Sequence, residues 1–272
     1  MKRLVDDFWK IAVLACFLLT LAFLIGPLIV AISMSFDARG YLAPFPPTSL
    51  SLRWYASFFA NEAFISGLWN SLILGFSATL VSAMIGTMAA YVITNYDFRG
   101  KAVLSALFLS PLMIPAVVVG LALLVFFSRA GLFNGFFRLL CAHVIVTLPF
   151  TVRAALASLT GIKRSLIEAA MSLGANERQA FWHVTFPIAK TGIFAGCVFA
   201  FAYSLDDVAA SLFLYDTRSI TLPVALVGHM RANFDLSVAA ATTFLAFITV
   251  LLIIVLDRLI GLNRVVGRGI YR

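Results

Sequence analysis

Asp206 and Asp207 stand next to each other inside a long apolar stretch, in the sequence Ser204-Leu205-Asp206-Asp207. A charged side chain at the centre of a bilayer costs roughly 2.5–3.5 kcal/mol on insertion scales, so each acid needs a partner, a proton or water. One use for them is structural, because the Ser-x-x-Asp spacing matches a capping box that restarts a helix after a break. The other use is functional: Asp206 can attract a cationic solute to a cavity beside such a break.

Helical spacing separates the two acids. Every fourth residue before them is small, which places small residues on one face of the expected helix. Such residues allow helices to approach closely in lipid. These residues are Gly192, Gly196, Ala200 and Ser204. Asp207 falls near the middle of this face and Asp206 about 100° away from it. We therefore expect Asp207 to face packed helices and Asp206 to face a lumen.

A second group of residues lies in the polar stretch 161–187. Apolar residues at helical spacing are followed by Gly174, which is typical of a helix that ends at a glycine. Ser165 and Glu168 match a capping box that would start this helix, and a second helical segment is expected from Glu177 toward Pro187. A short amphipathic helix of this kind either lies on lipid or docks into a partner's groove.

The order of residues in this stretch is Glu168-Ala169-Ala170, three residues, Gly174, nine residues, then Val184-Thr185-Phe186-Pro187. It resembles the EAA loop of the permeases of binding-protein-dependent ABC importers, with Val184 and Phe186 where that family has Ile and Leu. The resemblance implies that the first helix is a coupling helix seated in a cleft of a separate ATP-binding subunit. By this resemblance the residues that couple to the ATPase are Glu168, Ala169, Ala170, Gly174 and Pro187.

Shorter matches resemble the spermidine/putrescine permease branch of this family. They are Arg53-Trp54-Tyr55, Asn70-Ser71, Ser165-Leu166, Ser204–Asp207 and Thr221-Leu222-Pro223. The branch implies an ATP-driven importer that moves a small solute, such as putrescine or spermidine, by alternating access. It also contains importers of iron, aminophosphonates, opines and amino-acid-like solutes, which stay open as alternatives. The substrate path is assigned to Ser204, Asp206 and Asp207.

The sequence contains no phosphate-binding loop. Its one Gly-Lys pair, Gly100-Lys101, is followed by Ala102 and has Asn95 where the first glycine of G-x-x-x-x-G-K-[ST] belongs. Its three histidines have no ligand neighbours at metal spacing, and neither HExxH nor GxSxG occurs. We therefore expect a transport subunit rather than an enzyme, with no catalytic residue, cofactor or metal site of its own, and ATP bound by a partner. The lone histidines are expected to be satisfied core or interface residues.

The elements that position these residues are membrane helices. The chain is 62% hydrophobic and 12% charged, against about 45–50% and about 25% in soluble domains. Six apolar runs reach the ~20 residues that a spanning helix needs. They cover residues 11–33, 64–94, 102–128, 139–159, 188–212 and 236–260, and Pro111 and Pro115 interrupt the third. We expect an all-α membrane protein with the type I ABC importer permease fold and a single domain, 1–272.

Charge gives the orientation, because Lys and Arg accumulate on the cytoplasmic side of spanning helices. With both termini inside, 14 of the 20 basic residues lie on that side and 6 on the other. The inner ones are Lys2, Arg3, Lys10, Arg99, Lys101, Arg153, Lys163, Arg164, Arg178, Lys190, Arg258, Arg264, Arg268 and Arg272. We therefore interpret the net charge of +8 as a sign of membrane topology and expect no nucleic-acid partner. Stretch 161–187 is then cytoplasmic, in a multi-pass protein of the bacterial inner membrane.

The resemblance also implies partners, which are two ATP-binding subunits held by loop 161–187, a second permease subunit and a periplasmic solute-binding protein. An alternative of another class is an autonomous channel or ion-driven carrier, in which Asp206 and Asp207 bind the coupling ion. Internal repeats would favour a carrier, but the two halves show no evident self-similarity. A membrane enzyme is a third alternative and lacks a reactive set of residues.

The topology predicts which loops can be labelled from outside. In intact cells, a membrane-impermeant thiol reagent should modify cysteines placed in 37–62 and leave cysteines placed in 161–187 unmodified, because the bilayer shields the second loop. Both positions should react after permeabilisation, which is the control. Labelling of 161–187 alone in intact cells would show that the orientation is inverted.

Overall fold

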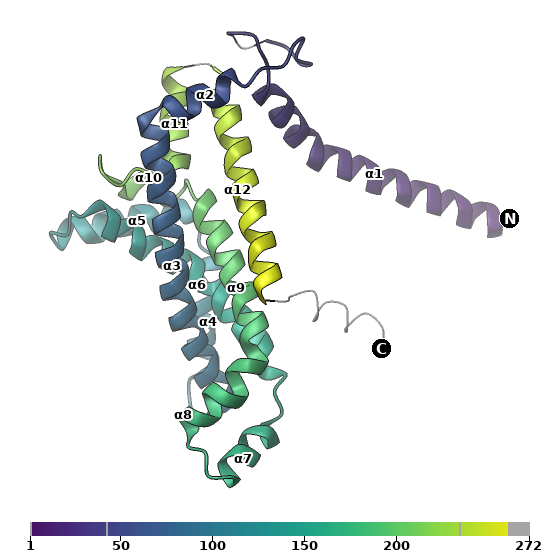
Figure 1. Cartoon of the computed structure of the whole chain (residues 1–272). Coiled ribbons are helices and arrows are strands. Elements are labelled where there is room, and N and C mark those ends of the chain that lie inside the picture. The colour runs from purple at the N-terminus through teal and green to yellow at the C-terminus, as the bar shows by residue number, and fades with distance from the viewer. Residues whose placement is uncertain (1, 42, 234, 261–272) are drawn as a thin grey trace. The chain divides into compact units, whose positions relative to one another are not determined.

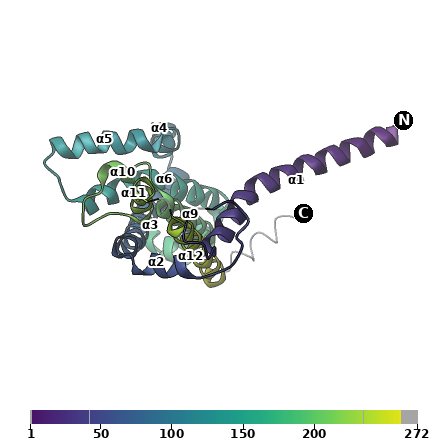
Figure 2. The same cartoon turned by 90° about the horizontal axis from the view of Figure 1, so that it is seen from above.

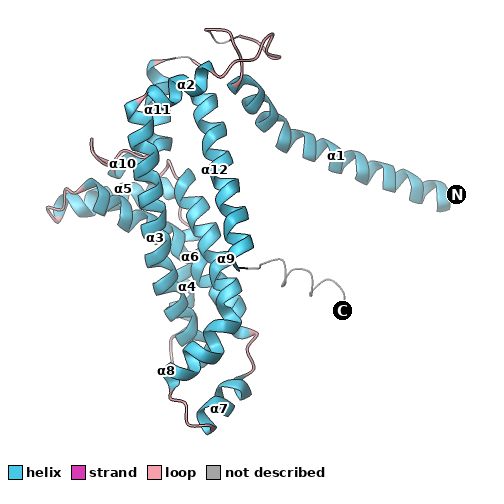
Figure 3. Ribbon diagram, viewed as in Figure 1, coloured by secondary structure: helices cyan, strands magenta, loops and turns pink. Residues whose placement is uncertain are grey.

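The described part of the chain is almost entirely helical. In the computed structural model it comprises residues 2–41, 43–233 and 235–260. Within these ranges Asp37 and Leu50 form an isolated bridge, and no strand is present (Figure 3). The all-α expectation is confirmed. Arg264, Arg268 and Arg272, which the topology places inside, lie outside the described residues.

Five helical stretches are long and apolar enough to cross a membrane. They belong to α1 (Lys2–Ser35), α3 (Glu62–Asn95), α6 (Gly135–Thr160), the stretch that ends with α9 (Phe186–Asp206), and α12 (Ser237–Ile260). The shorter helices are α2 (Arg53–Ala60), α4 (Lys101–Leu109), the 3₁₀ turn η1 (Ser110–Leu112), α5 (Ala116–Arg129), α7 (Arg164–Ser172), α8 (Glu177–Ala180), the π-helix η2 (Phe181–Thr185), α10 (Ser211–Leu214) and α11 (Leu222–Ala232). Together α4, η1 and α5 are also long and apolar enough, which gives up to six spans if this bent pair counts as one.

The chain divides into two compact units. The first comprises Met1–Ile65 and Leu226–Ile248, and the second comprises Ser66–Ala225 and Thr249–Arg272. The helices α3, α11 and α12 each contribute residues to both units.

The first unit has a small core at the end of α1. Met34, Trp54, Leu236 and Ala240 form a buried apolar cluster. The loop after α1 is held by the Asp37–Arg39 ion pair, and the hydrogen bonds from Arg39 lower the pKa of Asp37. By contrast, no side chain described between residues 9 and 33 of α1 is buried. An apolar helix without a buried face is typical of a span that meets lipid or another subunit.

Small residues bring α6 and α9 together in the second unit, where the two helices run side by side (Figure 1). A Cβ atom on Gly196 would lie 2.8 Å from the Cβ of Ala154, and one on Gly192 would overlap the Ser158 hydroxyl. Ala200 and Ser204 continue this face and are buried. The face predicted from four-residue spacing is therefore the face that packs on α6.

The third apolar run is not a single straight helix. The segment splits into α4 and α5, whose axes differ by 101° at a break of a few residues (Figure 2). Pro111 lies in η1 and Pro115 directly precedes α5 in an extended conformation. Proline lacks the N–H that continues a helix, and its ring clashes with the preceding turn, so two prolines four residues apart favour such a break. The expectation of one span over 102–128 is corrected to a bent pair.

The fifth run also differs from its predicted bounds of 188–212. Helical structure is continuous from Glu177 through α8, η2 and α9, and it ends at Asp206. Pro187 lies inside this continuous stretch, just after the π-helix η2, and does not end it. Asp207 leaves the helix with an extended conformation, and α10 begins only at Ser211.

The packing of α6 on α9 predicts the effect of adding one methyl group. Gly196→Ala should destabilise the protein by about 1–3 kcal/mol, because the new Cβ has no room beside Ala154. Gly26→Ala in α1 is the matched control, since nothing lies within 4 Å of its added Cβ. Thermal unfolding midpoints in detergent measure both. Equal midpoints for the two variants would contradict the close approach of α6 and α9.

Candidate functional site

The predicted coupling helix is α7, which lies beside α8 at the end of the second unit (Figure 1). It ends where predicted, because Gly174 has φ +92°, a conformation that side chains with a Cβ rarely adopt. Its start differs from the prediction: Lys163 precedes the first turn without a side-chain cap, and the expected Ser165–Glu168 capping box is not formed. Glu168 instead lies 3.1 Å from Arg164, and both side chains are exposed.

The surface of α7 is available to a partner. None of its residues is buried. Glu168 and Ala169 are exposed, Ala170 is half-buried, and Leu166 and Leu173 expose apolar side chains around them. Pro187, the last predicted coupling residue, is exposed at the beginning of α9. The helix therefore presents small and apolar residues beside one acid.

The turn after α7 is stabilised by a capping box that the sequence analysis missed. Asn176 Oδ1 accepts a hydrogen bond from the Gln179 backbone N–H at 2.9 Å, and Gln179 Oε1 accepts one from the Asn176 N–H at 2.9 Å. The N-x-x-Q spacing is the signal that could have identified it. From this point one helical stretch runs without interruption to Asp206.

Two contacts also join this segment to the end of α3. The Tyr96 hydroxyl donates to Glu177 Oε2 at 3.2 Å, and this bond raises the pKa of Tyr96. The rings of Tyr91 and Phe181 meet edge to face at 5.1 Å. The segment that follows α7 is thus attached to two spans, α9 directly and α3 through side chains.

At the other end of α9 the two predicted acids have different surroundings, as their helical spacing predicts. Asp206 is exposed, and its side chain takes part in no hydrogen bond or ion pair found among the described residues. Asp207 is buried, with 7% of its surface exposed. Its Oδ2 accepts hydrogen bonds from the backbone N–H groups of Ala210 and Ser211, at 3.2 and 3.0 Å, and from the Ser211 hydroxyl at 3.0 Å.

These bonds assign the capping role to Asp207. The predicted box had Ser204 as the cap and Asp207 as its partner, whereas in the structure the Asp207 side chain accepts from the N–H groups of Ala210 and Ser211 at the start of α10. Ser204 lies inside α9, and its hydroxyl is 2.7 Å from His143 Nδ1. The expected role of Ser204 as a cap is therefore wrong.

His143 connects both sides of the break after α9. It is fully buried in α6, with Nδ1 bonded to Ser204 of α9 and Nε2 2.8 Å from the hydroxyl of Ser211 in α10. Its Nε2 also lies 3.8 Å from Asp207 Oδ2. The sequence predicts a satisfied core histidine at this position and gives no link between it and the acids. The available signal was the polar spacing of His143, Thr147 and Thr151 along one face of α6.

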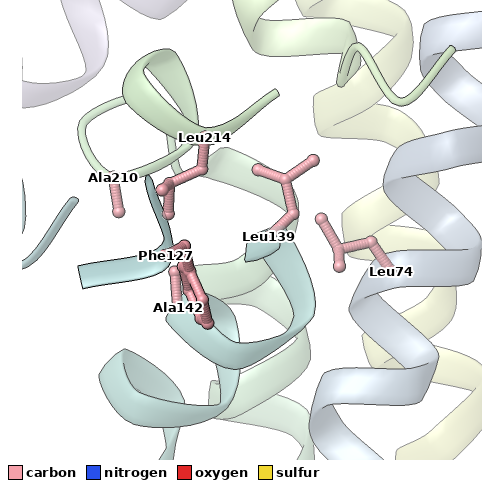
Figure 4. Close-up of a cluster of buried hydrophobic side chains, with 6 residues drawn as sticks. All are labelled: Leu74, Phe127, Leu139, Ala142, Ala210 and Leu214. Carbon is pink, nitrogen blue, oxygen red and sulfur yellow. The ribbon is translucent and has the colours of Figure 1, made fainter. Parts of the chain in front are cut away.

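A buried apolar cluster adjoins this polar cluster along the chain (Figure 4). Ala142 and Ala210 adjoin His143 and Ser211 in sequence and belong to a buried cluster that also contains Leu74, Phe127, Leu139 and Leu214. Hydrogen bonds in such surroundings are strong, and an unsatisfied polar group there is costly. Four side chains, His143, Ser204, Asp207 and Ser211, satisfy one another beside the exposed Asp206.

The chain has similarity to one transport family over most of its length. Residues 82–264 match the family described as binding-protein-dependent transport system inner membrane component. The spermidine/putrescine transport system permease protein PotC of Shigella flexneri is 28% identical over 248 residues, which cover 91% of this chain and 93% of that protein. A probable molybdenum ABC transporter permease protein of Haloferax volcanii is 35% identical over 185 residues, which cover 64% and 68%.

A solved structure supports the fold. One chain of the bacterial alginate ABC transporter, crystallised with an alginate pentasaccharide-bound periplasmic protein, superposes with a TM-score of 0.71 at 20% identity and covers 93% of each chain. The helical arrangement expected from the sequence is therefore one that ABC importer permeases adopt.

Proposed function

Because the chain belongs to the family of binding-protein-dependent transport system inner membrane components, we propose that this ABC importer permease subunit carries a polyamine, such as putrescine or spermidine, across the bacterial inner membrane. The observation that carries the choice of solute is the similarity to PotC over about nine-tenths of both chains. The exposed acid Asp206, at the end of a span, supports it further. A permease subunit is not an enzyme, and its ATP is hydrolysed by a separate subunit.

A second solute is favoured by one finding. The Haloferax volcanii relative has the higher identity, 35%, and its name assigns it to molybdenum. This finding favours a small solute other than a polyamine. The resemblance to the branch leaves iron, an aminophosphonate, an opine or an amino-acid-like compound as the alternatives. The importer mechanism is the same in either case, and the two proposals differ only in the solute that contacts Asp206.

The partners of this proposal are two ATP-binding subunits, a second permease subunit and a periplasmic solute-binding protein. The alginate transporter, which has the same fold and was crystallised with its periplasmic protein, supports an assembly of this kind. We assign the ATP-binding subunit to loop 161–187, because α7 exposes a small apolar surface beside Glu168. A helix laid in a groove is a common mode of such recognition.

The assembly implies an orientation and a domain. Both termini and loop 161–187 are cytoplasmic in this proposal, which the distribution of basic residues supports. Residues 1–272 act as one transmembrane permease domain in a multi-pass protein surrounded by lipid, with no cofactor of its own. The solute passes between this chain and the second permease.

The continuous helical stretch Glu177–Asp206 joins the coupling loop to the proposed solute contact. It contains 30 residues, which extend about 45 Å at 1.5 Å per residue. Closure of the ATP-binding subunits displaces α7, and the capping box at Asn176 and the bond from Tyr96 to Glu177 transmit this displacement to α9 and α3. Asp206 at the far end contacts the cationic solute, and the buried Asp207 holds the shape of the chain beside it. Ser204 is buried against His143 and does not contact the solute.

The coupling assignment predicts uptake lost without loss of ATP hydrolysis. Glu168→Ala should remove a contact with the ATP-binding subunit, and Gly174→Ala should strain the turn by about 1–2 kcal/mol because its φ is +92°. Both variants should assemble, hydrolyse ATP and accumulate several-fold less solute per ATP in proteoliposomes. Gly161→Ala is the matched control in the same loop, since its φ is not positive. Normal coupling in both variants would remove the assignment.

The solute assignment predicts a selective effect of Asp206→Asn. Loss of a charge-assisted contact worth about 1.5–3 kcal/mol should raise the KM for putrescine roughly tenfold or more and leave assembly intact. Asp207→Asn is the contrasting variant. It should lower the yield of assembled complex, because that acid is buried and caps α10. Unchanged uptake kinetics in Asp206→Asn would exclude the contact and favour the alternative solutes.

A further inference from the structure

The hydrogen bonds around His143 all run in one direction, which follows from which atoms can donate a hydrogen. The Ser211 hydroxyl donates its single hydrogen to Asp207 Oδ2 at 3.0 Å. The oxygen of Ser211 can therefore only accept the bond from His143 Nε2, which means that this ring nitrogen carries a hydrogen.

The remaining ring nitrogen follows from the same reasoning. With the hydrogen on Nε2, the Nδ1 atom of a neutral imidazole is an acceptor, and the Ser204 hydroxyl donates to it at 2.7 Å. The hydrogen bonds run in one direction, from Ser204 through His143 and Ser211 to the carboxylate of Asp207. Each bond polarises the next in surroundings of low dielectric constant.

The cluster spans the one place where helical structure stops beside the exposed acid. Asp206 is the last residue of α9, and Asp207, with φ −68° and ψ 117°, turns the chain out of the helix. His143 holds Ser204 on the near side of this break and Ser211 on the far side. Because Asp207 is bonded to Ser211, the backbone that carries the Asp206 side chain is tied on its C-terminal side to α6.

The cluster also has little freedom to move. Ala142 and Ala210, the residues next to His143 and Ser211 in the chain, belong to one buried apolar cluster with Phe127, Leu139 and Leu214 (Figure 4). A Cβ on Gly120 of α5 would lie 2.9 Å from the Cα of Ala210, so α5 closes directly over the break. Close packing on both sides confines His143 and Ser211 to their observed arrangement.

We propose that His143 is a positioning residue, which acts through Ser211 and Asp207 to set the direction in which Asp206 presents its carboxylate to the cationic solute. This inference rests on the proposed role of Asp206 as a solute contact. It assigns the effect to the bond with Ser211, which reaches the break, and not to the bond with Ser204, which lies within α9. If His143 served packing alone, loss of either bond would have the same effect on uptake.

The directional chain allows matched variants of His143. In His143→Gln the side-chain amide can reach the position of Nε2 and donate to Ser211, whereas the shorter amide of His143→Asn reaches only the position of Nδ1. Ser211→Ala and Ser204→Ala remove the two bonds singly. The measurement is ATP-driven putrescine uptake by the complete importer in proteoliposomes, with its binding protein, as KM and kcat.

The expected result is a division between two pairs. His143→Asn and Ser211→Ala should raise the KM for putrescine about fivefold or more with kcat changed less than about twofold, whereas His143→Gln and Ser204→Ala should keep both values within about twofold. Equal effects at Ser204 and Ser211, or a loss confined to kcat, would overturn the positioning role. If His143→Asn does not assemble, Ser211→Ala and Ser204→Ala decide the question.

A second measurement separates this inference from the identity of the solute. A single cysteine is placed at Asp206 after Cys16, Cys141 and Cys197 are replaced by alanine, and its rate of reaction with a charged thiol reagent is followed without solute. Ser211→Ala should change this rate about threefold or more, and Ser204→Ala should leave it unchanged. Equal rates in all three proteins would overturn the inference. Normal putrescine kinetics in Asp206→Asn would instead overturn only the solute contact.

Discussion

Inside a bilayer the protein itself must satisfy every polar group, because lipid offers neither donors nor acceptors. This requirement shapes the end of α9. The helix stops at Asp206, and the first N–H groups of the next helix would have no partners. The carboxylate of Asp207 accepts two of them, the Ser211 hydroxyl bonds to the same oxygen, and His143 satisfies both neighbouring serines. A break in the span is tolerated because these four side chains satisfy one another.

Close contact between helices is the second condition. Lipid tails are as apolar as leucine, so association of spans depends on packing and interhelical hydrogen bonds. Gly192 and Gly196 let α9 approach α6 until no further carbon fits between them. The same approach brings Ser204 within 2.7 Å of His143. The small-residue face and the buried polar cluster are therefore parts of one contact, and Asp206 owes its position to both.

Proline has a different effect at each of its positions in these spans. Pro149 lies within the continuous helix α6, and Pro187 begins α9. Pro111 and Pro115 accompany a change of direction of 101°. The difference arises from the packing of the helical segment that follows the proline. After Pro115, α5 packs through Gly120 against Ala210, the residue just before α10. A proline removes one helical hydrogen bond, but neighbouring contacts decide where the chain goes next.

The sequence alone determined the membrane class, the number of apolar segments, the turn at Gly174 and the separation of Asp206 from Asp207. Each of these depends on composition or on spacing within one helix, which periodicity reports directly. The tertiary structure decided the 101° bend, the end of α9 at Asp206 and the capping role of Asp207. It also decided the partners of His143, since Ser204 and Ser211 lie 61 and 68 residues away along the chain. Spacing within a helix is local, whereas the partner of a buried polar group is chosen by which helices meet.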